Sequence, residues 1–343
     1  MSAADARLGA GRRARARVAT IIMVALLLVA GVLTLCLGDF GLTPGDVVQV
    51  LLGGGERLDR FIVTEVRLPR LVLAVLVGAA FGLSGGLFQS VLRNPLASPD
   101  VIGVTSGASV AALAALLGGA SPWIVSASAF GGALLVSGVI AALSMRGGHG
   151  ISGYRFVLIG IAVALMGRAV LEWVLTRSDV RDASTALSWL VGSVGNSRWP
   201  EILVLAIAMA VLLPLVAASA RPLGLLESGD ELATGLGAPA RRLRPLLLAL
   251  AVALAAAGTA AAGPMAFVAL IAAPVARRVL RLGRPSLGAT ALVGALIVAW
   301  ADIVAQHALP ETIAVPAGIV TGAIGAAYLL WLLATGRDRE RSR

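Results

Sequence analysis

The chain has 343 residues, of which 58% are hydrophobic and only 13% are charged. Soluble domains carry about 25% charged residues, so this composition indicates a polytopic membrane protein. The net charge of +10 comes from basic residues scattered over short loops, and such scatter does not form the basic stripe of a nucleic-acid-binding protein. The single Cys36 excludes a disulfide framework, and with only two distant histidines we expect no metal-ligand cluster and no cofactor.

The chain begins with an Arg-rich tail over residues 1–17, and a predicted first span over 18–37 follows it. This apolar run is about 20 residues long, which is enough to cross a bilayer. Because no small-residue cleavage site follows the run, we expect a retained helix rather than a signal peptide. The arginines of the tail place it in the cytoplasm by the positive-inside rule.

Further apolar runs of span length follow at 68–90, 101–119, 123–145, 155–176, 201–219, 286–305 and 313–334. The stretch between Arg244 and Arg277 has no charge and is too long for one span. Gly263 and Pro264 form a natural turn inside it, which predicts a hairpin of two spans. The sequence therefore predicts an all-α membrane protein of ten helices, with one transmembrane domain over 18–336. Both termini, including the tail 337–343, are expected in the cytoplasm.

Two predicted cytoplasmic loops are rich in helix breakers and small residues. The first, "RNPLASPD" (93–100), precedes "GVTSGAS" at the start of the next helix. It fits an ordinary Pro-rich turn, or a constriction at the inner mouth of a pathway, since irregular backbone at membrane depth needs protein or a watery cavity around it. The second, "HGISGYR" (149–155), fits a plain Gly-rich turn or part of the same constriction.

Two charges interrupt the run 155–176. Arg168 and Glu172 are four residues apart, so they lie on one face of a helix. Charges inside a span usually face the bundle interior or a cavity. The pair is consistent with a mutually neutralising lock between helices, or with a polar spot on a translocation pathway.

A short amphipathic helix is predicted after the run 201–219. Leu225, Leu232 and Leu236 can share one face of it, and Gly237 suits a C-terminal cap. The segment fits a solvated linker helix or a helix that docks on a partner.

Several long segments, in order, carry a resemblance to a known family. They are "RLPRLVLAVLVGAAFGLSGGLFQSVLRNPLASPDVIGVTSGAS", "ALSWLVGSVGNSRW", "GDELATGLG", "GPMAFVALIAAPVARR" and "ADIVAQHALPETIAVPAGIVTGAIGAAYLLWLL". From about residue 67 to its end, the chain resembles the iron-siderophore and vitamin B12 family of ABC importer permeases. The wording of the first segment is most similar to ferric-enterobactin permease subunits, which work as heterodimers. The resemblance implies a ten-helix fold and import of an iron(III)–siderophore complex across a bacterial inner membrane, with cobalamin or haem left open.

The resemblance also implies partners and sites. The partners are a second permease subunit, identical or homologous, two ATP-binding subunits, and a periplasmic or lipoprotein substrate-binding protein. The implied ATPase-coupling residues are Gly229, Glu231, Ala233, Leu236 and Gly237. The implied cytoplasmic gate residues are Asn94, Leu96, Ser152 and Gly153. At Arg168 and Glu172 the family usually has uncharged residues, so the resemblance supports neither interpretation of that pair.

Two arginines bracket Leu68-Pro69 at the predicted outer start of the second span. Since Pro is tolerated in a first helical turn, Arg67 and Arg70 are expected to project from the helix entrance. They fit a snorkelling pair at the headgroups of membrane lipid, and the resemblance implies docking to acidic residues of the substrate-binding protein. The sequence departs from the family's pattern at two places. Gln306 stands where the cobalamin-type members carry a third periplasmic arginine, and the helix break is moved by one residue to Ala273-Pro274.

Other function classes are tested by the same residues. Gly82-Leu83-Ser84-Gly85 is similar to the GxSG motif of intramembrane serine proteases, but neither His149 nor His307 is well placed as a base for Ser84. A proton-driven transporter needs intramembrane carboxylates, and Glu172 is the one clear candidate. A Walker A motif is impossible because the chain contains no lysine. We therefore expect a non-enzyme whose ATP is hydrolysed by a partner.

Overall fold

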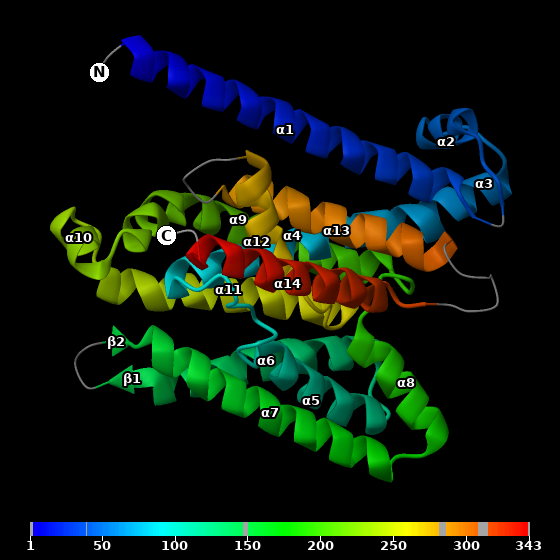
Figure 1. Ribbon diagram of the computed structural model, residues 1–343. Helices are drawn as coiled ribbons and strands as arrows, with labels where there is room; N and C mark the ends of the chain where they lie inside the picture. The colour runs from blue at the N-terminus through cyan, green and yellow to red at the C-terminus, as the bar shows by residue number, and fades with distance from the viewer. Residues whose placement is uncertain (1–2, 39, 147–149, 281–285, 308–314, 342–343) are drawn as a thin grey trace.

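The computed structural model describes residues 3–38, 40–146, 150–280, 286–307 and 315–341 (Figure 1). Its elements in chain order are α1 (Ala3–Cys36), α2 (Pro44–Leu51), α3 (Arg57–Phe61), the π-helical turn η1 (Ile62–Arg67), α4 (Leu68–Leu92), α5 (Val104–Leu117), α6 (Pro122–Ser144), β1 (Met145–Arg146), β2 (Gly150–Ile151), α7 (Gly153–Arg177), α8 (Val180–Val191), α9 (Trp199–Glu227), α10 (Asp230–Gly235), α11 (Ala240–Ala262), α12 (Val268–Leu280), α13 (Leu287–His307) and α14 (Ala317–Arg341).

The predicted all-α membrane class is confirmed. Within the described ranges, seven helices are long and apolar enough to cross a membrane, and α5 and α14 contribute shorter apolar stretches. Every predicted span coincides with a helix, and the charge-free stretch forms the two helices α11 and α12. The number of spans and the orientation of the termini stay predictions. The sequence did not indicate the small antiparallel hairpin β1–β2 beside His149, a residue that lies outside the described part.

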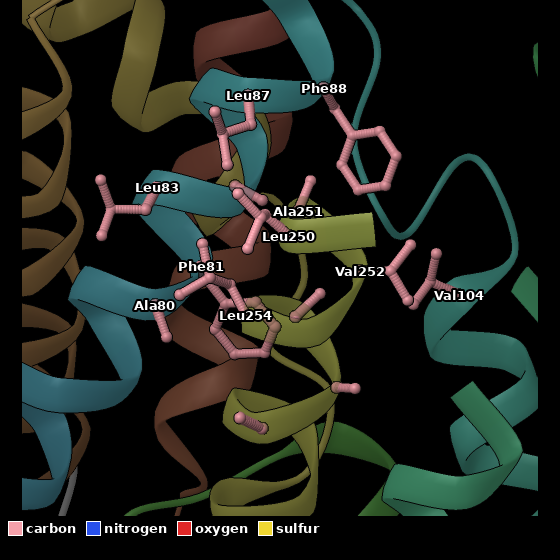
Figure 2. Packing of buried hydrophobic residues seen from close by; sticks show 14 of the residues in the cluster. Ala80, Phe81, Leu83, Leu87, Phe88, Val104, Leu250, Ala251, Val252 and Leu254 are labelled. Atoms are coloured by element: carbon pink, nitrogen blue, oxygen red, sulfur yellow. The ribbon is translucent and has the colours of Figure 1, made fainter. Parts of the chain in front are cut away.

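Helix α4 lies at the centre of the fold, with α9, α11, α12 and α13 packed around it (Figure 1). Figure 2 shows the apolar cluster in which Phe81 and Leu83 of α4 join Leu250 and Leu254 of α11 and Val104 of α5. Helix α1 lies along one side, against α13, while α5 to α8 form the opposite side. The elements α2, α3 and α8 lie at one end of the molecule, and α10 and the β-hairpin lie at the other.

Glycines on α4 let its backbone approach two neighbours directly. A Cβ added at Gly82 would lie 2.5 Å from the Thr290 carbonyl oxygen of α13, and Gly85 presses against the backbone of Ala269 on α12. Between them Ser84 is fully buried, and its hydroxyl donates to the Ala251 carbonyl at 2.7 Å. This is small-residue packing of membrane helices. The protease interpretation of the motif has no support here, because the hydroxyl is committed to a backbone acceptor.

The second span begins earlier than predicted. The helix runs from Arg57 through η1 into α4 without interruption, so Arg67 lies inside it rather than at its entrance. Pro69 has no N–H and its ring conflicts with the carbonyl four residues back. The wider π-helical turn directly before Pro69 accommodates that conflict.

Pro274 does not break α12, which runs through it from Val268 to Leu280. Proline at this position leaves the Leu270 carbonyl without its helical donor. Gln89 of α4 supplies the missing donor, since its Nε2 lies 2.8 Å from that carbonyl oxygen. The Oε1 of the same amide accepts from Arg277 Nη2 at 2.7 Å. The displaced proline is thereby compensated by one buried side chain from a neighbouring helix.

Candidate functional site

The segment predicted to couple ATP hydrolysis lies at the end of the molecule that carries the β-hairpin (Figure 1). The expected helix over 225–237 is wrong in extent, because α9 continues to Glu227 and the separate helix α10 covers only Asp230–Gly235. Gly229, with a φ of 118°, makes the break, and Leu225 therefore belongs to α9. Such a φ favours glycine, which explains this residue between the two helices.

The C-terminus of α10 is capped as predicted. Gly237 has a φ of 86°, its N–H donates to the Thr234 carbonyl at 3.0 Å, and the next N–H, of Ala238, reaches the Ala233 carbonyl at 2.8 Å. This is the Schellman arrangement. Ala233 is fully buried, whereas Glu231, Leu232, Leu236 and Gly237 are exposed. The five predicted coupling residues thus lie along α10 and its C-terminal cap, which Ala233 anchors, and the side chains of Leu232 and Leu236 are exposed on this segment.

The four predicted gate residues lie close together. Asn94 follows α4, and its side-chain oxygen accepts the Leu96 N–H at 2.9 Å, which fixes a tight turn. Ser152 precedes α7, and a Cβ added at Gly153 would lie 3.5 Å from Leu92, the last residue of α4. The structure therefore brings the two loops to one place, at the shared end of α4 and α7.

The segment after this turn explains why helix-breaking residues lie beside an apolar span. Helix α5 has 14 residues, a length of about 21 Å, which is short of the roughly 30 Å hydrocarbon core. Gly103, before its first residue, packs against α7 at Gly160 and Ala164. Residues 97–99, 102 and 103 are buried. Irregular backbone thus precedes α5 inside the protein, which is the setting in which a membrane tolerates it.

Arg93 links the turn that holds the predicted gate residues to the predicted coupling segment. It is one of two non-glycine residues with positive φ in the described chain, at 51°, and it ends α4. Its Nε donates to the Leu226 carbonyl of α9 at 3.0 Å. Leu226 lies three residues before Gly229, and Arg93 lies directly before Asn94. One side chain therefore connects the α9–α10 junction to the turn at Asn94.

Arg67 and Arg70 are not arranged as expected. Arg67 does not project, since it is 9% exposed and donates to the carbonyls of Leu35 and Phe40 at 2.7 and 2.6 Å. Leu35 is in the last turn of α1, where carbonyls lack helical donors, so Arg67 caps that helix. The expectation of an exposed pair is wrong for Arg67, because the longer helix places it beside the end of α1.

Arg70 forms a bidentate ion pair with Asp302 of α13. Its Nε and Nη2 lie 2.8 and 2.7 Å from the two carboxylate oxygens, and Gln306 Nε2 donates to the same carboxylate at 2.8 Å. The Arg70 side chain is 22% exposed and that of Asp302 is 3% exposed. Gln306 therefore supports Asp302.

Arg168 and Glu172 form the predicted pair on α7, with Nε and Oε1 2.8 Å apart. The pair does not lock α7 to another helix of this chain, since the two side chains are 77% and 63% exposed. The interpretation as a lock between helices of one subunit is therefore not supported. Among the described residues, no group of three or more His, Cys, Asp or Glu side chains could hold a metal ion.

Comparison with known proteins decides the family. Residues 26–335 match the FecCD transport family. The chain belongs to this family. It is 38% identical over 320 residues to the ferric enterobactin transport system permease protein FepG of Escherichia coli (strain K12), which covers 93% of this chain and 96% of that protein. It is 37% identical over 325 residues to the Fe(3+)-citrate import system permease protein YfmE of Bacillus subtilis (strain 168), covering 94% and 96%.

A solved structure supports the same assignment. An inward-facing metal-chelate type ABC transporter superposes with a TM-score of 0.82 at 26% identity, covering 92% of this chain and 98% of that one. The resemblance drawn from the sequence is thereby confirmed. This FecCD chain is a multi-pass ABC importer permease.

Sequence reasoning missed two residues that organise these sites in the FecCD chain. Asp302 is an acidic residue inside the apolar run 286–305, and an intramembrane carboxylate by itself indicates a partner. Arg93 is the first residue of the predicted loop 93–100, and the sequence indicates no specific role for it. Its role depends on a contact with Leu226, 133 residues away, which no local pattern signals.

Proposed function

We propose that this FecCD-family chain is the membrane-spanning subunit of an ABC importer that moves an iron(III)–siderophore complex into a bacterial cell across the inner membrane. The names of its relatives and the metal-chelate type structural neighbour support the substrate class. The absence of lysine from the sequence excludes a Walker A motif, which supports ATP hydrolysis by separate subunits. Two such subunits, a second permease subunit and a substrate-binding protein complete the proposed assembly.

The geometry that best supports this proposal is the connection from α10 to the gate turn. In the assembly, Leu232 and Leu236 insert into a groove of the ATP-binding subunit, because they are apolar, exposed and held by a buried anchor at Ala233. A movement of α10 reaches the junction at Leu226 and is passed by Arg93 to Asn94. ATP hydrolysis outside the membrane thereby moves a turn beside the start of α7.

The proposed gate consists of Asn94, Leu96, Ser152 and Gly153. Leu96 is exposed, and Gly153 adds no side chain against α4. In a dimer of permeases, small side chains at this place let two copies close against each other and separate again.

The proposed docking site for the substrate-binding protein centres on Arg70. Asp302 holds its Nε and Nη2, so the guanidinium has a fixed orientation with one edge partly exposed. A carboxylate of the docking protein meets that edge, as a contact that sets orientation and association rate. Arg67 contributes by binding the end of α1 to the helix that carries Arg70, and not by contacting the substrate-binding protein.

Uptake by cells tests the function. A strain lacking the gene should lose uptake of radiolabelled iron–siderophore and regain it from a plasmid copy, while the uptake of other nutrients stays unchanged. Removal of the ATP-binding partner should abolish the same uptake, and persistence of uptake would instead indicate a proton-driven transporter. Uptake of labelled cobalamin or haem in place of iron chelates would correct the substrate class.

A further inference from the structure

Helix α7 carries its ion pair on a face that the rest of the chain leaves uncovered. Only 6% of its apolar window is buried, the lowest share among the seven span-length helices of the described chain. In Figure 1, α7 runs along the edge opposite α1, from the β-hairpin to α8. Arg168 and Glu172 are therefore open to whatever surrounds the subunit.

The depth of the pair makes contact with lipid unfavourable. Helix α7 has 25 residues, so its middle lies near Leu165. With the middle of α7 placed at the bilayer centre, a rise of 1.5 Å per residue puts Arg168 and Glu172 about 5 and 10 Å from that centre. Both positions fall within a hydrocarbon core that extends about 15 Å to each side. Charged side chains at such depth normally face protein or a water-filled cavity. An ion pair exposed on a span therefore requires a polar surrounding, which the described residues of this chain do not supply.

The face that carries the pair is continuous with the gate. Residues spaced three and four apart form one stripe on a helix, and here the stripe consists of exposed side chains, namely Tyr154, Leu158, Leu165, Arg168 and Glu172. The other side of α7 is packed, with Gly160 against Ile102 and Gly167 against Ser106. The stripe begins beside Ser152 and Gly153 and extends into the outer half of the membrane.

Symmetry distinguishes two interpretations of this face, a dehydrated contact between two permease subunits and a water-filled route between them. Two like permease subunits related by a twofold axis along the membrane normal place each residue opposite its own copy, at the same depth. A dry contact through this face would then bring Arg168 against Arg168 and Glu172 against Glu172. Like charges in a dehydrated contact repel strongly. A water-filled route between the subunits accommodates the same arrangement.

Resting on the function proposed above, we propose that Arg168 contacts the transported substrate and selects negatively charged, oxygen-rich iron(III) chelates, while Glu172 positions its guanidinium. Glu172 accepts a hydrogen bond from Arg168 Nε. The two terminal nitrogens of the Arg168 guanidinium can therefore donate to two oxygens of a chelate. Because Glu172 also offsets the charge, the contact stays weak enough for the substrate to leave, as conduction requires.

Water access to this face is the first test, and it does not depend on the substrate. In the assembled importer, with Cys36 replaced by Ser, the rate of thiol modification of Glu172→Cys is compared with that of Met166→Cys. Met166 is 68% exposed and lies on another face of α7. A charged, membrane-impermeant methanethiosulfonate should modify the first cysteine at least about tenfold faster than the second, because only ionised thiols in water react readily. Equal and slow modification of both would place the pair in lipid and overturn the inference.

Charge selection is the second test. Arg168→Gln in the reconstituted importer should raise the KM for anionic ferric citrate on the order of tenfold, and Arg168→Lys should raise it less. Uptake of an uncharged ferric hydroxamate, complex assembly and substrate-free ATP turnover should not change. An equal effect on both chelates, or on neither, would overturn the inference. Failure of the unaltered complex to take up either chelate would count against the proposed function instead. The methanethiosulfonate experiment would then still decide whether water reaches Arg168 and Glu172.

Discussion

The ion pair between Arg70 and Asp302 allows a quantitative test of how the outer face is built. Arg70→Gln removes two charge-assisted hydrogen bonds and leaves the Asp302 side chain, which is 3% exposed, with a hydrogen bond from Gln306 Nε2. Removing one partner of a buried pair costs roughly 3–5 kcal/mol, and the partial exposure of Arg70 favours the lower value. We therefore expect a loss of about 3 kcal/mol, which corresponds to about 4 °C in apparent Tm for a chain of this length.

The assay is thermal unfolding of the purified permease in lipid nanodiscs, followed by aggregation-sensitive chromatography. Arg70→Gln combined with Asp302→Asn is the matched control, since it removes the unpaired charge and should recover most of the lost Tm. The stable double variant should still bind the substrate-binding protein more weakly than the unaltered permease, because the proposed docking guanidinium is absent. A normal Tm for Arg70→Gln alone would refute the structural reasoning.

Three further predictions concern coupling, gating and packing. Gly237→Trp places a bulky side chain at an exposed position of positive φ just beyond the end of α10, so purified complex should lose substrate-stimulated ATP turnover while the subunit still folds. Normal transport by that variant would show that α10 does not couple ATP hydrolysis to transport. A Cys at Ser152, with Cys36 replaced, should crosslink to the second permease subunit to a degree that depends on bound nucleotide, and crosslinking indifferent to nucleotide would favour a plain turn. Gly82→Val should abolish stable expression, because no space exists between α4 and the Thr290 carbonyl, whereas Gly138→Val, which meets nothing within 4 Å, should express normally.

The sequence by itself determined the class of the protein. Low charge and long apolar runs are properties of composition and local order, so they predict spans without reference to contacts. Turn chemistry was equally readable, since the cap at Gly237 follows from the φ that only glycine readily adopts. The family could be recognised because long segments match in order, which requires no structure.

Only the tertiary structure decided which polar groups are already engaged. Arg67 and Arg70 look alike in sequence, yet one caps α1 and the other pairs with Asp302, 232 residues away. Gln89 looked like an ordinary residue of a span, yet it satisfies the carbonyl that Pro274 leaves without a donor. In each case the desolvation cost of a buried polar group is met by a partner from another helix. Local sequence cannot specify that partner, because helix packing brings the two groups together.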